Sequence, residues 1–525
     1  MSALNFLAST SALSNESMLS TSMIGLVIAF LLHFVLGRLM KSPAQRLPYP
    51  PGPPPRDIIT GNARDLMASP KLWLTLTEWA PVYGPIFYLR SLNQDMIVLN
   101  TLEDTVELME RRSNNYSDRW IVPLIDLSGW TYATTFKRYG PAWQDHRRLL
   151  HQKFRPAASL TFRPIQVEKV NDMLNSLLAT PEDFMTHIKT LSAAIIMSAM
   201  YGYKVKAKND EFQELAEVAM AALSKSMYPN SSIVNVLPFL CFLPTWFPGA
   251  VFHRFALTVK DQITRMQEVL YKYVQDNLAA GTAAPSFVAD FLDGCKTEED
   301  HNVLKETAAT AYAAGADTTT SSLGTFFYAM AISPEVQKKA KEELERVIGG
   351  DRLATYDDED FLPYIQAVIR EVFRWRPVVP LGVSHSATAE DVYKNYYIPK
   401  NTILVPNIWA MTRDPIKYEN PEEFNPDRFF DNNGELNTDD VGYTFGFGRR
   451  ICPGRHMASA TMFLAIANIL LAFDIRPPKD ASGKDISLDV EYTGGLINHP
   501  LPFNCSITPR SDRKRLLADL KENDF

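Results

Sequence analysis

The stretch that decides the fold is Phe445-Gly-Phe-Gly448-Arg-Arg450-Ile-Cys452-Pro-Gly454, and a long apolar run follows it from Met457 onward. The apolar run predicts a helix, so Cys452 is expected where a loop turns into that helix. Free amides and the dipole at a helix N-terminus stabilise an anion, and this favours the thiolate form of cysteine. The alternative is that Cys452 is simply a small buried apolar residue, as a lone cysteine usually is.

The other residues of this stretch suit a flat cofactor that carries carboxylates. Gly448 and Gly454 have no side chain, and this lets the backbone approach a planar molecule closely. Arg450 offers a fork of N–H donors that matches a carboxylate. A chance occurrence of all these residue types at these spacings would be rare, so the cofactor interpretation is favoured.

This pattern resembles the signature of the cytochrome P450 superfamily, Phe-x-x-Gly-x-Arg-x-Cys-x-Gly, and residues 445–454 fill every fixed position. The resemblance extends over almost the whole chain. It implies a mainly α fold with a small β portion, as a single large haem domain behind an N-terminal transmembrane helix. It also implies that haem b is the cofactor and that Cys452 is the axial ligand of its iron, where a thiolate promotes O–O cleavage.

Composition excludes several other classes. The net charge of −7 gives no reason to expect nucleic-acid binding. The four cysteines show no CxxC pair or metal-finger spacing, so neither a disulfide framework nor a zinc site is indicated. No Gly-x-Gly-x-x-Gly motif follows a predicted strand, so NADPH and flavins are expected to act only through a partner reductase.

Helical periodicity dominates the body of the chain. One helix is predicted from Pro334, with Ser333 as its N-cap and Gly349 just past its end. Short β-branched runs predict a few strands, at residues 96–99, 397–399 and 402–405.

The N-terminus predicts a membrane anchor. Residues 19–40 are almost free of charge and long enough for a bilayer core of about 30 Å. Basic residues follow the apolar core, so residues 1–18 are expected in the lumen, where Asn15 is the one glycosylation sequon that would be used. A cleaved signal peptide is the alternative, but no basic region precedes the apolar run. The predicted location is the endoplasmic reticulum membrane, crossed once.

A proline-rich hinge is expected at residues 41–56, where proline makes the chain stiff and extended; a mere linker is compatible with this. Residues 57–525 then form the cytosolic haem-thiolate catalytic domain.

The run Ala314-Gly-Ala-Asp317-Thr318-Thr319 resembles the family's oxygen-activation motif. By itself it would be a small-residue helix that packs closely on a neighbour. Beside a haem, its small side chains would leave room for O2 and substrate, and Gly315 would permit a local kink. The match implies that Thr318 hydrogen-bonds dioxygen and that Asp317 relays protons from solvent, which makes these two the predicted catalytic residues.

Glu371 and Arg374 are an i,i+3 pair on one helical face. An exposed salt bridge of this kind would contribute about 0–1 kcal/mol. In the family the pair is the Glu-x-x-Arg motif, buried on the proximal side of the haem, and Arg428 matches its third member. The predicted role of all three is structural.

Trp143 and Arg147 resemble the family's Trp-x-x-x-Arg helix, in which positions i and i+4 face one haem propionate. His385 lies where the family has another propionate donor, although a lone histidine is more often a satisfied polar group. The predicted haem-binding residues are thus Trp143, Arg147, His385, Phe445, Gly448, Arg450, Cys452 and Gly454.

Basic residues gather near two of these motifs. They would form a docking patch for an acidic electron donor or be scattered solubilising charge. They are Arg138, Arg147, Arg148, Lys153, Arg449 and Arg455.

The resemblance also names the segments that line the substrate pocket, and their side chains here are nearly all apolar, which predicts a lipophilic substrate. The overall pattern looks most like fungal members that oxidise terpenoid or aromatic secondary metabolites. The apolar segment 237–249 would dip into the membrane or form a core loop. The predicted pocket residues are Trp120, Ile121, Leu124, Trp130, Tyr312, Ala313, Val378, Val379, Leu381, Leu496 and Ile497.

Three functions compete. The leading one is a monooxygenase that inserts one oxygen atom from O2 into the substrate with electrons from NADPH. A haem-thiolate isomerase or dehydratase that does not use O2 is the second, and intact Asp317 and Thr318 argue against it. The third is a non-catalytic haem protein, which the apolar pocket and the oxygen motif disfavour.

Overall fold

The computed structural model describes residues 42–57, 60–91, 94–206, 210–227, 232–513, 515–516 and 518. The predicted lumenal segment, the anchor at 19–40 and Asn15 lie outside these residues. The described residues belong to two compact units. The smaller unit joins residues up to Pro50 with Ala389–Lys400, and the larger unit contains Pro51–Thr388 and the residues from Asn401 onward.

The larger unit is mainly helical, as predicted. Its α-helices are α2 (Ala63–Ala68), α3 (Leu72–Tyr83), α4 (Leu102–Val106), α5 (Pro123–Leu127), α6 (Pro141–Phe154), α7 (Pro156–Ser159), α8 (Arg163–Ala179), α9 (Phe184–Tyr201), α10 (Glu211–Ser226), α11 (Ile233–Val236), α12 (Val251–Ala280), α13 (Phe287–Leu292), α14 (Glu298–Ile332), α15 (Pro334–Val347), α16 (Pro363–Trp375), α17 (Ile408–Met411) and α18 (Arg455–Ala472).

The small β portion is also present. In the larger unit a four-stranded sheet has the order β1 (Ile86–Ser91), β2 (Gln94–Leu99), β6 (Ile403–Pro406), β3 (His385–Ser386), and a separate pair joins β7 (Phe473–Arg476) to β8 (Ser506–Pro509). In the smaller unit, β4 (Asp391–Tyr393) pairs with β5 (Tyr396–Ile398). Strands β2, β5 and β6 confirm the three runs that the sequence predicted.

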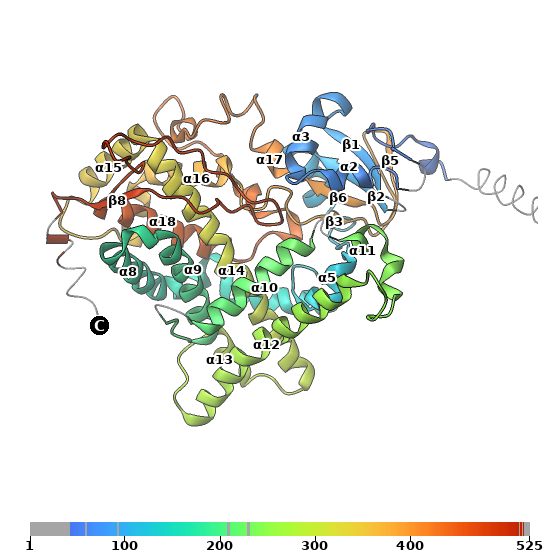
Figure 1. Cartoon of the computed structure of the whole chain (residues 1–525), viewed down its shortest axis with the longest axis horizontal. Coiled ribbons are helices and arrows are strands. Elements are labelled where there is room, and N and C mark those ends of the chain that lie inside the picture. The colour runs from blue at the N-terminus through green and yellow to red at the C-terminus, as the bar shows by residue number, and fades with distance from the viewer. Residues whose placement is uncertain are drawn as a thin grey trace, which may run out of the picture. The chain divides into compact units, whose positions relative to one another are not determined.

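Helix α14 runs through the middle of the larger unit, where it contacts α6, α9, α10, α12, α13 and α18 (Figure 1). A capping box starts it: the Thr297 hydroxyl accepts from the Asp300 amide, and the Asp300 carboxylate accepts from the Thr297 amide. Most residues from Leu304 to Ala331 are buried. A helix that is apolar or small on every side is typical of a buried core helix.

Helix α18 follows the cysteine loop and is the second buried core helix. Among the described helices it is the one that is long and apolar enough to cross a membrane, but 72% of that apolar stretch is buried inside the protein. It packs against α8, α14, α15 and α16. These contacts hold the cysteine loop against the core.

Two local expectations differ in detail from the structure. Helix α15 begins at Pro334 and Gly349 follows its end with φ 79°, as predicted, but Ser333 makes no side-chain capping bond. The β4–β5 hairpin belongs to the predicted domain 57–525, yet it clusters with the N-terminal segment. The reason is that the Tyr397 amide donates to the Pro48 carbonyl at 2.8 Å and its ring contacts Tyr49.

Candidate cofactor site

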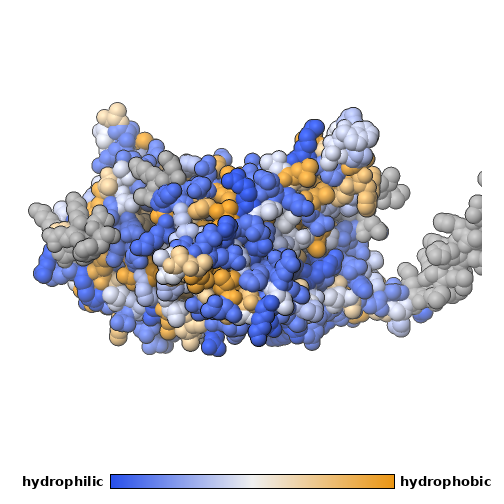
Figure 2. All heavy atoms as spheres, turned by 90° about the horizontal axis from the view of Figure 1, so that it is seen from below, coloured by the Kyte–Doolittle hydropathy of each residue, from blue (hydrophilic) through white to orange (hydrophobic). Residues whose placement is uncertain are grey.

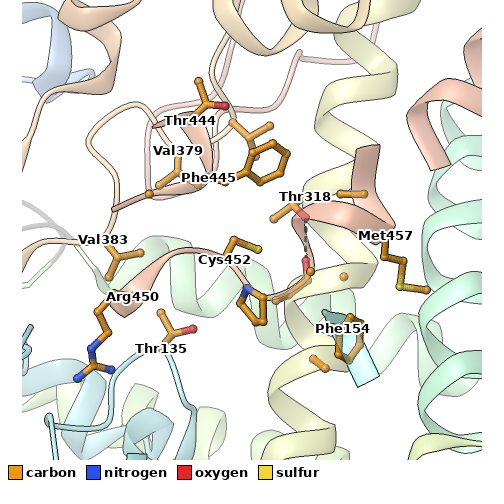
Figure 3. Close-up of a pocket in the computed structure, with 18 of the residues that line it drawn as sticks. Thr135, Phe154, Thr318, Val379, Val383, Thr444, Phe445, Arg450, Cys452 and Met457 are labelled. Atoms are coloured by element: carbon orange, nitrogen blue, oxygen red, sulfur yellow. Dashed lines mark hydrogen bonds between the residues drawn. The ribbon is translucent and has the colours of Figure 1, made fainter. Parts of the chain in front are cut away.

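A cavity of about 320 Å³ lies inside the larger unit, and most of its wall is apolar. It is bounded by α6, α9 and α14, by the chain that follows α16, and by the loop that leads into α18. In Figure 3, Thr318 of α14 and Cys452 of the loop lie around the same space, with Phe445 and Val379 beside them. The structure therefore brings together residues that are 134 positions apart in the sequence.

Cys452 lies in the loop just before α18, and its sulfur faces the cavity. The Cys452 amide donates to the Phe445 carbonyl at 2.9 Å, which holds the loop closed. Burial raises the pKa of the Cys452 thiol, against the lowering effect of the Gly454 and Arg455 amides and the Arg147 charge. The amides at the helix N-terminus lower the pKa of the thiol, as expected, but burial raises it by more. A metal cation at the sulfur would reverse the balance, because a coordinating thiol is deprotonated.

The two signature glycines serve different purposes. Gly448 has φ +54°, and a Cβ there would lie 2.2 Å from the Met109 carbonyl oxygen. Gly448 is not part of the cavity wall, so the close approach it permits is to the backbone of Glu107–Arg111 and not, as predicted, to the cofactor. Gly454 does line the cavity, and a Cβ there would lie 3.9 Å from the Cys452 sulfur.

Two buried guanidinium groups face the cavity. Arg450 donates to the carbonyls of Ser117, Thr134 and Lys137, and burial lowers its pKa to about 10. Arg119, which the sequence did not single out, donates to the carbonyls of Thr135, Val383 and Ser384. Burial and the neighbouring charge of Arg450 hold its pKa well below its usual value. Two buried cations without a hydrogen-bonded carboxylate fit a ligand with anionic groups, such as the haem propionates.

The Trp-x-x-x-Arg pair and His385 also line the cavity. Arg147 donates to the Ile451 carbonyl at 2.7 Å, next to Cys452, and the Trp143 ring lies under the Arg450 guanidinium at 4.5 Å. His385 Nδ1 lies 2.6 Å from the Tyr116 carbonyl, so it must carry the proton there. Burial and the Arg119 charge lower the pKa of His385, so it would donate to a propionate from Nε2 only once that carboxylate stabilises the imidazolium.

The predicted structural triad lies in the core. Arg374 makes two bonds to Glu371, at 2.6 and 2.8 Å, and both side chains are fully buried. Arg428 approaches Glu371 at 3.3 Å, and the Asn425 amide donates to the same carboxylate. None of the three lines the cavity, which is consistent with a supporting role. The exposed salt bridge that was the alternative is excluded by the burial.

Of the two predicted catalytic residues on α14, one lines the cavity and the other does not. Thr318 lines the cavity, and its hydroxyl donates to the Ala314 carbonyl at 3.0 Å. Asp317 does not line it; its carboxylate lies 3.1 Å from Nε2 of His499, a residue that the sequence did not single out. Helix α14 is continuous through Gly315, where a Cβ would lie 2.7 Å from Ile196 of α9. The glycine allows the two helices to pack closely.

Most of the residues predicted to contact the substrate do not line this cavity. Val378 and Val379 line the cavity. Tyr312 instead donates its hydroxyl to the Phe212 carbonyl, Leu124 packs against α12, and Leu381 packs against the sheet. Other predicted contacts that lie outside the wall of this cavity are Trp120, Ile121, Trp130, Ala313, Leu496 and Ile497.

Thr318 shares the cavity-lining side of α14 with other residues of the helix. They are Thr310, Ala311, Ala314, Gly315, Thr319 and Ser322. Tyr312 and Ala313 do not line the cavity.

The basic residues mostly have local partners. Arg138 pairs with Asp118, Arg148 with Asp145 and Lys153 with Asp290. Arg449 donates to Tyr139 and Asn114, and Arg455 to the Cys452 carbonyl. These contacts are compatible both with a docking patch for an acidic electron donor and with scattered solubilising charge.

The fold and the cavity define a class: mainly helical proteins in which a cysteine, in the loop before a core helix, faces a mostly apolar cavity. The family model for cytochrome P450 matches residues 50–506. The cytochrome P450 monooxygenase COX1 of Coprinopsis cinerea is 37% identical over 504 residues, which cover 93% of this chain and 96% of the relative. The cytochrome P450 monooxygenase ppsD of Aspergillus oryzae is 38% identical over 478 residues, with 89% and 90% covered.

The chain therefore belongs to the cytochrome P450 family, and it is a monooxygenase of that family. The resemblance that the cysteine loop indicated is confirmed over nearly the whole chain. Membership in the family implies haem b, and the buried guanidiniums and the cavity-facing sulfur fit that group.

Proposed function

We propose that this monooxygenase inserts one oxygen atom from O2 into a lipophilic small molecule, a terpenoid or aromatic secondary metabolite, with electrons from NADPH delivered by a partner reductase. The observation that carries this proposal is the Cys452 sulfur facing a mostly apolar cavity whose opposite wall includes Thr318. Apolar walls favour a substrate with few ionic groups. Relatives from fungi that are named cytochrome P450 monooxygenases support the reaction class.

Cys452 would hold the haem iron, while Arg119, Arg147, Arg450, Trp143 and His385 would hold the propionates. When bound, a thiolate-ligated haem supplies the centre at which O2 is activated. Thr318 would position a proton at the cavity wall through its hydroxyl, which is free to turn away from the Ala314 carbonyl. Asp317 would act from outside the cavity wall, with His499 as its partner.

An isomerase or dehydratase that does not use O2 is the alternative. Thr318 keeps a hydroxyl at the cavity wall, which such a reaction does not need, so the monooxygenase is favoured.

We also propose that residues 19–40 anchor the chain in the membrane, with residues 1–18 in the lumen, and that the segment between α11 and α12 contacts lipid. In that segment Phe242 is 89% exposed and Trp246 is 78% exposed, with Phe239 and Val251 nearby. Exposed clusters of this kind mark interaction sites. Figure 2 shows one face of the molecule, where hydrophobic residues form separate patches among hydrophilic ones.

The proposal is tested by the CO-difference spectrum of the reduced protein. The wild type should give the red-shifted band of thiolate ligation, and Cys452→Ser should lose it while Cys505→Ser, away from the cavity, keeps it. Thr318→Ala should keep the band but divert electrons from NADPH to peroxide. A wild-type spectrum typical of imidazole or water ligation would refute the proposal, and turnover without O2 would favour the isomerase.

A further inference from the structure

The two guanidiniums at the cavity depend on one short loop. Arg450 donates to the carbonyls of Thr134 and Lys137 at 3.3 and 2.8 Å, and Arg119 donates to the Thr135 carbonyl at 3.0 Å. Residues 134–137, called here the carbonyl loop, thus help to orient both charges, together with the carbonyls of Ser117, Val383 and Ser384. In Figure 3, Arg450 and Thr135 lie on the same side of the Cys452 loop. A shift of the carbonyl loop would disturb hydrogen bonds of both guanidiniums.

The carbonyl loop is in turn fixed to α6 and α14. The Thr134 amide donates to the Thr310 hydroxyl at 3.1 Å, and the Thr134 hydroxyl lies 2.9 Å from His146 Nδ1. At the other end of the loop, the Lys137 ammonium lies 2.9 Å from a carboxylate oxygen of Glu306. The same oxygen lies 3.3 Å from His146 Nε2. The Glu306 carboxylate on α14 therefore contacts Lys137 at one end of the loop and His146, the partner of Thr134, at the other.

His146 is buried, with 1% of its surface exposed, and its ring joins Thr134 to Glu306. Burial lowers the pKa of His146, so the ring is neutral near pH 7. With its proton on Nε2, facing the carboxylate, Nδ1 accepts from the Thr134 hydroxyl. Nε2 is within ion-pair distance of Glu306 but not aligned for a hydrogen bond. The directional contact of the His146 ring is therefore its hydrogen bond with the Thr134 hydroxyl.

Glu306 supplies the charge of the cluster. Burial raises the pKa of Glu306, but the nearby Lys137 ammonium and His146 ring outweigh this, and the net shift of the pKa is downward. Lys137, His146 and Glu306 line a polar pocket, whereas Thr134 and Thr310 line the cofactor cavity. The cluster and the two threonines thus form a polar wall between the pocket and the cavity.

We propose that Glu306, His146 and Lys137 form a latch that holds the carbonyl loop and thereby aims Arg119 and Arg450 at the carboxylates of the cofactor. His146 and Glu306 are positioning residues, because they act through the loop and do not line the cavity. The inference rests on the proposed haem site and extends it to residues outside the cavity wall.

The test is the rate at which haem leaves the purified holoenzyme for excess apomyoglobin. His146→Leu removes the bond to Thr134, and loss of one buried hydrogen bond should speed haem loss by about two- to tenfold. Glu306→Gln, which keeps the shape of the side chain, should act in the same direction and serves if His146→Leu does not fold. The control is Lys153→Met. Lys153 lies on α6, like His146, and its substitution removes an ion pair with Asp290 of α13, which should leave the rate unchanged.

The dimethyl ester of haem distinguishes an effect on the direction of the two guanidiniums from an effect on the packing around the haem. In the dimethyl ester of haem the carboxylates are masked, so the guanidiniums have no anion to hold. The wild type and His146→Leu should then lose the cofactor at equal rates. Unchanged haem loss in both variants, or a difference that persists with the ester, would overturn the latch. A wild type that binds no haem would instead refute the proposed function, so the two failures are distinguishable.

Discussion

Glu371 and Arg374 have no exposed surface, and this makes their pair sensitive to the loss of either member. Arg374 also donates to the carbonyls of Thr412 and Glu423, so it joins α16 to the chain beyond α17. The sequence predicted the pair from its spacing. The burial that makes it important comes from surrounding segments that lie far away in the chain.

Arg374→Met should lower the free energy of unfolding by about 3–5 kcal/mol, because Glu371 would keep a buried charge with Arg428 alone opposite it. Urea unfolding followed by circular dichroism measures this. The control is Lys272→Met, which breaks an exposed i,i+4 pair with Asp276 and should change stability by less than about 1 kcal/mol. Equal effects of the two substitutions would contradict the structural role of the triad.

At the scale of elements, the packing of α14 on α9 defines one wall of the cavity. Gly315 of α14 and Ile196 of α9 meet there, and both line the cavity. The sequence predicted α14 as a helix of small residues with a neighbour close by, and this is the arrangement observed. The identity of the neighbour was not predictable, because it is not encoded in the motif itself.

Gly315→Ala should destabilise the protein by about 1–3 kcal/mol, because the new methyl group would lie 2.7 Å from Ile196 Cγ1. Ile196→Ala removes Cγ1 and Cδ1, two of the three closest atoms, and leaves only Cβ at 3.0 Å. The double variant should therefore be less destabilised than the two single effects added together. Thermal unfolding of the four proteins gives the coupling. Strict additivity would show that the contact is not responsible.

At the scale of the whole molecule, the question is which surface meets the membrane. The aromatic segment before α12 is exposed, and the predicted anchor precedes the described residues. Exposed tryptophan and phenylalanine are suited to the boundary between lipid and water. The sequence predicted the apolar character of residues 237–249 and left open whether they are covered; Phe239, Phe242 and Trp246 are exposed in the structure.

In vesicles that contain brominated phosphatidylcholine, the fluorescence of the full chain should be quenched partly through Trp246. Trp246→Phe should therefore reduce the quenched fraction. Trp73→Phe is the matched control, because Trp73 is 2% exposed and lies in the core beside the sheet. An equal quenched fraction in the wild type and Trp246→Phe would mean that this segment does not reach lipid.

The sequence by itself determined the class of this protein, because the cysteine loop, the Thr318 motif and the Glu371 pair are short patterns whose chemistry depends on local spacing. Only the tertiary structure decided which side chains surround the cavity. Arg119, His146, Thr134 and His499 carry no motif, and their partners come from other segments of the chain. Burial and charge pairing depend on contacts between distant segments, and local spacing does not encode those contacts.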